Sequence, residues 1–319
     1  MSVAIDVSIL VVNYNTANLL GKMREALDHS SGNLTVEIVV VDNASRDDSV
    51  AVLRRDFQDV KLIVNNANVG FGRANNQALA GTTGRYVLLL NTDAFVGADT
   101  LTKTVAYMDA HAECGVLGVR LIGRDGELQP SCRYFPTPWN VFLVRTGLSR
   151  FFPGTRLVDD MAWDQAQVRE CDWVPGCYCL IRRSAIDQVG LFDSRYFLYY
   201  EEVDLCLAAK RAGWKVVCYP HSSVIHLGGE SAKSDSALTA SGQQIQVMQI
   251  ESELLYFRKN SGVTGVLASV LLSSLGDAIL CSKHLIRGRG WAGAATYLQH
   301  SKEVWRLLVK TRWGTAETR

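Results

Sequence analysis

The chain has 319 residues, 48% of them hydrophobic, and a formal net charge of +1. This length suits one large globular domain with an appendage, or two modest domains, and the balanced charge argues against nucleic acid as a partner. Eight cysteines show no CxxC spacing, which argues against zinc and fits reduced thiols in a cytosolic protein. Asp6 interrupts the first apolar run with no basic segment before it, so we expect no signal peptide.

Short apolar segments alternate with helical patterns over the first third of the chain. The segments 7–12, 36–41, 61–64 and 86–90 are rich in β-branched residues and leucine, which predicts strands that are covered on both faces. Ser45 and Asp48 predict a capping box for the second helix. The alternation predicts an α/β fold with a mainly parallel sheet and flanking helices.

Polar residues follow three of these strands at the point where each strand ends. They are Asn13, Asn15, Asp42, Thr92 and Asp93. Ligands of parallel sheets bind beyond the carboxyl ends of the strands, so Asp42 is a candidate acceptor for a pyrimidine N–H and Asp93 a candidate ligand for a nucleotide-bound cation. The alternative for each residue alone is ordinary turn chemistry.

A glycine-containing segment lies between the third and fourth predicted strands. Gly70 and Gly72 permit close approach of the backbone, and Arg73 and Asn75 lie at the expected start of a helix, where phosphate binds favourably. The segment is not the dinucleotide GxGxxG pattern. Taken alone, its default interpretation is a loop without a ligand.

Three carboxylates occur within four residues at Glu201, Glu202 and Asp204, after a run of aromatic residues. Adjacent acids are costly to bury, which favours a catalytic role such as general base. The alternative is the first turn of a helix, where negative charge suits the macrodipole. Downstream, the segment 216–220 predicts an edge strand that ends at Pro220.

Six motifs occur in a fixed order over residues 5–232: Val-Val-Asn-Tyr-Asn (11–15), Val-Asp-Asn-Ala-Ser (41–45), Asn-Val-Gly-Phe-Gly-Arg-Ala-Asn-Asn (68–76), Leu-Leu-Asn-Thr-Asp-Ala (89–94), Trp-Val-Pro-Gly (173–176) and Tyr-Glu-Glu-Val-Asp-Leu-Cys (200–206). Together they resemble family 2 glycosyltransferases, in particular the rhamnosyltransferase-like branch. The resemblance implies the GT-A fold, with a Rossmann-like sheet joined to an acceptor-binding half. It also implies inverting transfer of a sugar from a nucleotide sugar.

The resemblance assigns roles to residues of this chain. It implies Glu202 as general base, with Asp204 and Glu201 as fallbacks, and a divalent cation, Mg²⁺ or Mn²⁺, held by Asp93 and His226. The family's Asp-x-Asp motif aligns with residues 91–93, and Asn91 departs from it. The residues implied to bind the nucleotide sugar are Asn13, Asn15, Asp42, Gly70, Gly72, Arg73, Asn75, Thr92, Asp93, Trp173 and Gly176.

The C-terminal part predicts helices. One apolar helix face spans residues 247–257 and ends near Gly262, and residues 263–280 are marginal as a membrane span. Further basic residues are interleaved with three tryptophans, which favours helices that lie on an anionic membrane surface. The alternative is a helical pair that packs on the catalytic domain or on a second subunit, so a homo-oligomer stays open.

We therefore expect a GT-A domain at 1–235, with a nucleotide-binding half at about 1–111 and an acceptor half at about 112–235, followed by a helical region at 236–319. The predicted function is sugar transfer to a lipid-linked or oligosaccharide acceptor in cell-surface polysaccharide synthesis. The branch suggests dTDP-rhamnose as donor, and a UDP-hexose is the alternative. The predicted location is cytoplasmic, on the inner face of the membrane. The rival functions are a noncatalytic sugar-nucleotide-binding protein and a nucleotidyltransferase, although Asn-Tyr-Asn-Thr is not the basic loop that the latter needs.

Overall fold

The computed structural model describes residues 4–319 except 160, 162, 230–242 and 289. The chain forms two compact units. The first contains Met1–Arg133, Met161–Ser194 and Glu201–Ser241, and the second contains Tyr134–Asp160, Arg195–Tyr200 and Gly242–Arg319. The predicted domain boundary at 235/236 falls outside the described residues.

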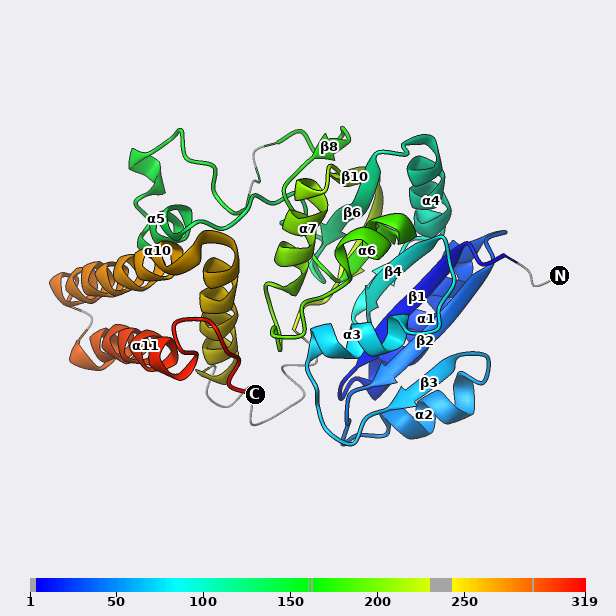
Figure 1. Cartoon of the computed structure of the whole chain (residues 1–319), viewed down its shortest axis with the longest axis horizontal. Helices are drawn as coiled ribbons and strands as arrows, with labels where there is room; N and C mark the ends of the chain where they lie inside the picture. The colour runs from blue at the N-terminus through cyan, green and yellow to red at the C-terminus, as the bar shows by residue number, and fades with distance from the viewer. Residues whose placement is uncertain (1–3, 160, 162, 230–242, 289) are drawn as a thin grey trace. The chain divides into compact units, whose positions relative to one another are not determined.

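The first unit is built on one mixed sheet with the order β3-β2-β1-β4-β9-β6-β10-β5 (Figure 1). The neighbouring strands β3, β2, β1 and β4 are parallel to one another. Strand β9 is antiparallel to both of its neighbours, β4 and β6. The prediction of an α/β sheet with flanking helices is confirmed. The strands are β1 (Val7–Asn13), β2 (Val36–Asp42), β3 (Lys61–Val64), β4 (Tyr86–Asn91), β5 (Ala94–Val96), β6 (Cys114–Ile122), β7 (Leu128–Gln129), β8 (Arg169–Glu170), β9 (Tyr178–Arg182) and β10 (Lys215–His226).

Helices flank this sheet and place its strand ends. The strands pack through alternating apolar positions, and Val7, Ile9 and Val11 of β1 share one core with Leu20 and Met23 of α1. The apolar stripe of α1 therefore packs against the apolar residues of β1, as the patterns predict. The helices are α1 (Ala17–Ser31), α2 (Ser49–Asp56), α3 (Phe71–Leu79), α4 (Thr100–Ala110), α6 (Arg183–Val189) and α7 (Glu201–Arg211).

Two local predictions are wrong. Helix α2 begins at Ser49, and Asp48 makes no capping bond, because the Ser45 hydroxyl instead accepts hydrogen bonds from Asn13 and Asn15. Strand β10 does not end at Pro220. It continues to His226 across an irregularity between Tyr219 and Ser223, where a residue without an N–H is tolerated.

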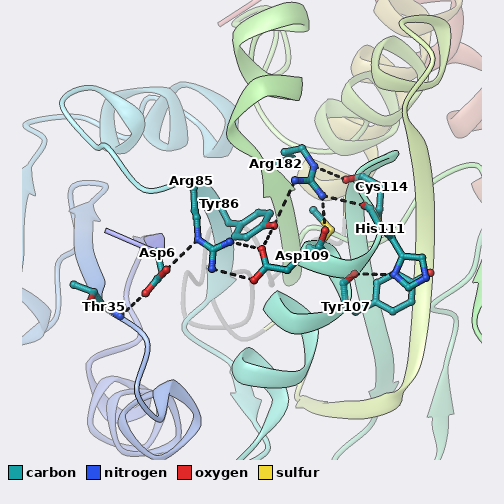
Figure 2. Close-up of polar contacts among 10 residues, drawn as sticks. Asp6, Thr35, Arg85, Tyr86, Tyr107, Asp109, His111, Cys114 and Arg182 are labelled. Atoms are coloured by element: carbon teal, nitrogen blue, oxygen red, sulfur yellow. Dashed lines mark hydrogen bonds and ion pairs between the residues drawn. The ribbon is translucent and has the colours of Figure 1, made fainter. Parts of the chain in front are cut away.

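A network of ion pairs fastens the amino-terminal end of the parallel strands (Figure 2). Arg85 pairs with both Asp6 and Asp109, and Asp109 also accepts a 2.7 Å bond from the Tyr86 hydroxyl. Burial, with the bond to Asp109, raises the pKa of Tyr86 to about 12. Arg182 donates to the carbonyl oxygens of three residues that end α4 and begin β6. These contacts hold β4 at the end opposite Asn91, so they are structural.

The second unit is helical. It contains α5 (Pro138–Thr146), the long helix α10 (Gln243–Ile286) and α11 (Trp291–Lys310), and α10 packs against both of the others. Gly262 interrupts α10 with φ 69° and ψ −161°, at the position where the sequence predicts the end of a helix. Gly276 of α10 lies against Phe142 and Thr146 of α5, where these two helices pack together.

Gly118 of β6 tests how closely this sheet packs against the segment before β9. A Cβ at this position would lie 2.6 Å from Cβ of Val174, a distance that real Cβ atoms do not adopt. We expect Gly118→Ala to lower the free energy of unfolding by about 1–3 kcal/mol, because overpacking forces both elements apart. Chemical denaturation measures this change.

The matched control is Gly21→Ala in α1, where a Cβ would meet nothing within 4 Å. It should leave stability unchanged or raise it, because alanine favours the helix. Equal stability of the two variants would show that the contact with Val174 is not a constraint.

Candidate active site

A buried hydrogen-bond network joins the carboxyl ends of β1 and β2. The Asn13 side chain donates a 2.7 Å bond to the Asp42 carboxylate and a 3.0 Å bond to the Ser45 hydroxyl. The other Asp42 oxygen accepts from the backbone N–H of Ser45 at 3.0 Å. Both Asn13 and Asp42 are fully buried. The structure brings these two predicted residues together and uses them to fix the loop after β2.

The same network reaches β4. The Thr16 hydroxyl donates to Asn13 Oδ1 at 2.7 Å and lies 2.8 Å from the Thr92 hydroxyl. Asn15 has φ 54°, a left-handed conformation that asparagine tolerates, and its side chain accepts a bond from the Arg46 N–H. Three strand ends are therefore joined at one edge, which is the arrangement that the sequence predicts.

Asn43 is a positioning residue. The sequence places it with Asp42 at the end of the second strand but assigns it no role. Its Oδ1 accepts from Val69 N at 3.0 Å, and its Nδ2 donates to Asn68 Oδ1 at 2.8 Å. Gly70 follows with φ 89°, a conformation that disfavours any other residue, and α3 begins directly after it. The side chain of Asn43 thus fastens the glycine loop to the end of β2. Its position directly after Asp42 was the available signal.

The polar residues of α3 mostly hold protein groups. Arg73 Nε donates to the carbonyl oxygen of Ser194 at 2.8 Å, and Asn75 donates to the carbonyl of Phe71 within its own helix. Asn76 pairs with both the N–H and the carbonyl of Phe192. Gly72 and Asn75 are buried. Of the residues predicted near a diphosphate, Gly70 lies in the turn that leads into the N-terminus of α3.

Asp93 and His226 lie together at the ends of β4 and β10. Nε2 of His226 is 3.7 Å from Asp93 Oδ1, and the Leu227 N–H donates to the Asp93 carbonyl. His226 Nδ1 lies 3.0 Å from Gln129 Oε1, while Gln129 Nε2 donates to the His226 carbonyl. The orientation of Gln129 makes Nδ1 the protonated nitrogen, so the lone pair of Nε2 faces the carboxylate.

Two electron-pair donors that face each other at this distance fit a divalent cation. The buried Oδ1 of Asn91, two residues earlier, has no hydrogen-bond partner among the described residues and is a further oxygen at this edge. The described residues contain no group of three or more His, Cys, Asp or Glu side chains placed for a metal. The protein set is therefore small, as for ions that keep water or phosphate ligands.

The acidic residues occupy the first turn of α7. Glu201 and Asp204 are buried, and Oε2 of both Glu201 and Glu202 is inaccessible and has no hydrogen-bond partner among the described residues. Burial raises the pKa of Glu202, and burial together with the neighbouring Glu202 raises the pKa of Glu201 further. A helix N-terminus satisfies some of this charge, but it does not account for two orphaned carboxyl oxygens.

Gly176 connects the acidic turn with the glycine loop. A Cβ at Gly176 would lie 3.7 Å from the Phe71 ring and 3.9 Å from Glu202 Cβ, so this glycine lies next to both residues. Trp173 is 5% exposed, and the Arg133 guanidinium lies 4.1 Å from its ring centroid. Arg133 also acts electrostatically on Glu202. Sequence reasoning missed Arg133, because nothing in the sequence relates residue 133 to residue 202.

Cys177 shows that the two acidic groups share one neighbourhood. Burial raises the pKa of its thiol, and the negative charges of Asp93 and Glu202 both add to the shift. Its carbonyl accepts a 3.1 Å bond from the N–H of Asn91. The segment 176–177 is thus a neighbour of both Asp93 and Glu202. These two residues are the predicted metal ligand and the predicted base.

A model of glycosyl transferase family 2 matches residues 8–190. The chain therefore belongs to this family, and it is a glycosyltransferase. Rhamnosyltransferases are among its relatives.

Two relatives are similar to this chain over more than half of its length. The N-acetylglucosaminyl-diphospho-decaprenol L-rhamnosyltransferase of Mycobacterium tuberculosis is 30% identical over 219 residues, which cover 63% of this chain and 70% of that protein. Rhamnosyltransferase WbbL of Escherichia coli K12 is 26% identical over 242 residues, or 72% of this chain and 86% of WbbL.

Solved structures establish the GT-A fold. Residues 1–349 of Staphylococcus aureus TarS match with a TM-score of 0.52 and 15% identity, over 97% of this chain and 92% of that one. Mannosyltransferase PcManGT from Pyrobaculum calidifontis, in complex with GDP-Man and Mn²⁺, matches with a TM-score of 0.55 and 15% identity, over 98% and 88%. The predicted fold class is confirmed.

The acidic pair predicts a pH-dependent stability. A carboxyl group whose pKa is raised by folding favours the folded state when it is protonated, and this contribution is lost as the pH rises from the ordinary carboxyl pKa toward the raised one. We expect Glu201→Gln to raise the free energy of unfolding at pH 7.5 by about 1–3 kcal/mol, the typical cost of a buried unsatisfied group. Thermal and urea unfolding at pH 7.5 and 5.0 measure the gain, which should shrink at the lower pH.

The control is Glu25→Gln on the exposed face of α1, which should change stability little at either pH. A Glu201→Gln variant that is less stable than the wild type at pH 7.5 would show that the ionised pair stabilises the fold.

Proposed function

We propose that the chain transfers a sugar, with inversion, from a nucleoside diphosphate sugar to a hydroxyl group of a lipid-linked glycan acceptor. The observation that carries the proposal concerns Glu202 Oε2 at the first turn of α7, beside Gly176. This oxygen is inaccessible and has no hydrogen-bond partner among the described residues. A buried carboxylate without a partner is expensive, and a raised pKa suits a group that accepts a proton near neutral pH.

In the proposed mechanism, Glu202 Oε2 takes the proton of the acceptor hydroxyl. The hydroxyl oxygen then forms a bond to the anomeric carbon, and the bond from that carbon to the diphosphate oxygen breaks on the opposite side. The configuration at the anomeric carbon inverts, and nucleoside diphosphate leaves with the electron pair. Asp204 and Glu201 are the alternative bases, and both side chains are buried in the same turn.

Asp93 and His226 would hold a divalent cation, with Gln129 fixing the imidazole tautomer. Such a cation supplies positive charge that offsets the charge on the leaving diphosphate. The matching PcManGT structure contains Mn²⁺ and GDP-Man, which supports a cation of this type. Gly70 and the N-terminus of α3 would face the diphosphate.

Asp42, Asn13 and Asn15 would form the nucleoside-binding edge, with Thr92 behind them and Arg73 and Asn75 holding α3 in place. Trp173 and Gly176 would line the sugar pocket. The donor we propose is dTDP-rhamnose, because two relatives are named as rhamnosyltransferases. The lipid-linked acceptor rests on the mycobacterial relative, whose name specifies a decaprenol diphosphate.

The C-terminal helices support a location at a membrane surface. On α11, Trp291, Leu298, Trp305 and Val309 are exposed, and they recur at intervals of seven and four residues, which places them on one helix face. Trp305 donates a 3.0 Å bond to Ser274 of α10. Near Ser274, the α10 residues Leu271 and Leu275 are also exposed, so the two helices present a shared apolar surface.

Charge and length favour helices that lie in the membrane surface. Residues 263–319 contain eight basic and three acidic residues, which attract anionic lipid. The segment Ile245–Ile286 is long and apolar enough to cross a membrane, but Gly262 breaks it and the buried Asp277 lies in its second part. We propose that this surface docks the enzyme on the inner face of the cytoplasmic membrane.

Donor turnover tests the enzymatic proposal. Release of nucleoside diphosphate from dTDP-rhamnose, UDP-glucose, UDP-galactose and GDP-mannose is measured with membrane lipid extract as acceptor, with and without Mg²⁺ or Mn²⁺. We expect one donor to be used, chelation to abolish turnover, and Glu202→Gln to lower kcat about 100-fold or more with little change in donor binding.

Asp204→Asn is the matched comparison. Full activity of Glu202→Gln with loss in Asp204→Asn would move the base to Asp204. Tight binding of one donor with no turnover under any condition would favour a noncatalytic sugar-nucleotide-binding protein.

Co-sedimentation with vesicles tests the membrane proposal. The wild type should bind vesicles with 30% phosphatidylglycerol much more strongly than pure phosphatidylcholine, and added salt should weaken the binding. Leu298→Glu with Val309→Glu should reduce binding about tenfold or more, because both side chains are exposed and lose membrane contact. Val64→Glu, an exposed valine of β3, is the control. Equal sedimentation of all three proteins would contradict the proposal.

A further inference from the structure

The second unit contains a cavity of about 240 Å³ that the proposed reaction does not use. Its wall comes from α5, from both parts of α10 and from α11, all within this unit. Half of the lining side chains are polar and half are apolar. The polar ones are Arg145, Gln246, Gln249, Glu253, Ser269, Ser273 and His300, and the apolar ones are Pro138, Val141, Phe142, Ile250, Leu254, Leu272 and Val304.

The positive charge in this cavity is already neutralised. Arg145 forms an ion pair with Asp277, which is 1% exposed, and also donates a 2.9 Å bond to the Ser273 hydroxyl. His300 Nδ1 lies 2.8 Å from the other Asp277 oxygen. Because Asp277 pairs with the cation on this wall, the cavity offers little attraction to a phosphate or to another anion.

Glu253 presents a carboxyl group to the same cavity. Its Oε1 accepts a 2.5 Å bond from Ser269, and its Oε2 accepts a 3.2 Å bond from the Tyr200 hydroxyl. Burial raises the pKa of Glu253, which favours a neutral carboxyl with a proton to donate. Gln246 and Gln249, both exposed, add amide donors and acceptors at the edge of the cavity.

We propose that this cavity is a binding site for one neutral sugar ring, which, on the proposed function, belongs to the acceptor or product glycan. Adjacent hydroxyl groups of a sugar both donate and accept, which matches the amide, hydroxyl and carboxyl groups of the lining. The apolar side chains of the lining suit the C–H face of a ring. The volume is below the roughly 300–1,000 Å³ of pockets for larger ligands, so it limits the occupant to about one ring. A lipid chain fits this lining less well, because it offers no hydrogen bond to the amides of Gln246 and Gln249 or to the carboxyl group of Glu253.

The site is also linked to the acidic turn through the chain itself. Tyr200, which bonds Glu253, directly precedes Glu201, and both Tyr199 and Tyr200 adopt left-handed conformations with φ 71° and 70°. Such conformations cost energy in a bulky residue and persist when the surroundings enforce them. A sugar that forms a hydrogen bond with Glu253 would therefore compete with or alter the bond from Tyr200 to Glu253. Tyr200 is the residue directly before the acidic pair.

Saturation-transfer NMR with the full-length protein tests the site. The two ligands are methyl α-L-rhamnoside and methyl β-N-acetylglucosaminide. Inorganic phosphate is added as an anionic competitor. We expect one glycoside to bind and phosphate not to displace it. Gln249→Ala and Glu253→Leu should each weaken binding about threefold to tenfold, the effect of losing one hydrogen bond. Gln299→Ala, an exposed glutamine of α11 outside the cavity, should bind like the wild type.

Nucleotide binding is measured in the same variants by quenching of tryptophan fluorescence with dTDP and UDP, and we expect it to be unchanged. No glycoside binding, equal binding by all variants, displacement by phosphate, or loss of binding in Glu202→Gln alone would each overturn the cavity proposal. Because nucleotide binding is read separately, failure of the cavity proposal is distinguishable from failure of the proposed transferase function.

Discussion

Two carboxyl groups buried side by side at the first turn of α7 are the constraint on which the candidate active site depends. Oε2 of Glu201 and of Glu202 lacks a hydrogen-bond partner among the described residues, and burial raises the pKa of both groups. A fold tolerates such a cost where the rest of the structure enforces it. Here the residues before the pair, Tyr199 and Tyr200, hold left-handed conformations.

The strand ends, in contrast, are held by polar side chains that have hydrogen-bond partners. The side chains of Asn13, Thr16, Asp42 and Thr92 satisfy one another, so the edge of the sheet is fixed before any ligand arrives. Asn43 extends this order to the glycine loop. A fixed edge lowers the entropy lost when a ligand binds, because few side chains need to be ordered. Asp93 follows Thr92 directly, so Asp93 and His226 lie next to this edge.

Hydrophobic patterns were sufficient to predict the parallel half of the sheet and the helix between each pair of strands. Periodicity reports burial directly, so the strands β1 to β4 fall close to their predicted limits. Local polar signals were less informative. Ser45 looks like a helix cap, yet it bonds Asn13, which lies 32 residues away. Pro220 looks like a strand end, yet an irregularity in β10 accommodates it.

The motifs were sufficient to propose the acidic turn, Asp93 and His226, and the structure brings these residues into one unit. The positioning residues were beyond reach. Arg133 acts electrostatically on Glu202, and Gln129 orients His226, which lies 97 residues away. Neither contact produces a recognisable pattern between residues that are close in the sequence. The contribution of Glu253 depends on a cavity that forms only when α5, α10 and α11 pack together.

The pH dependence of kcat/KM for donor turnover tests the central claim, that Glu202 is the general base, most directly. Because burial raises the pKa of Glu202, wild-type activity should rise with pH through a pKa above the ordinary glutamate value of about 4.3. The residual activity of Glu202→Gln should show no such rise. An acidic limb that persists unchanged in Glu202→Gln would contradict the account and assign the base to another group.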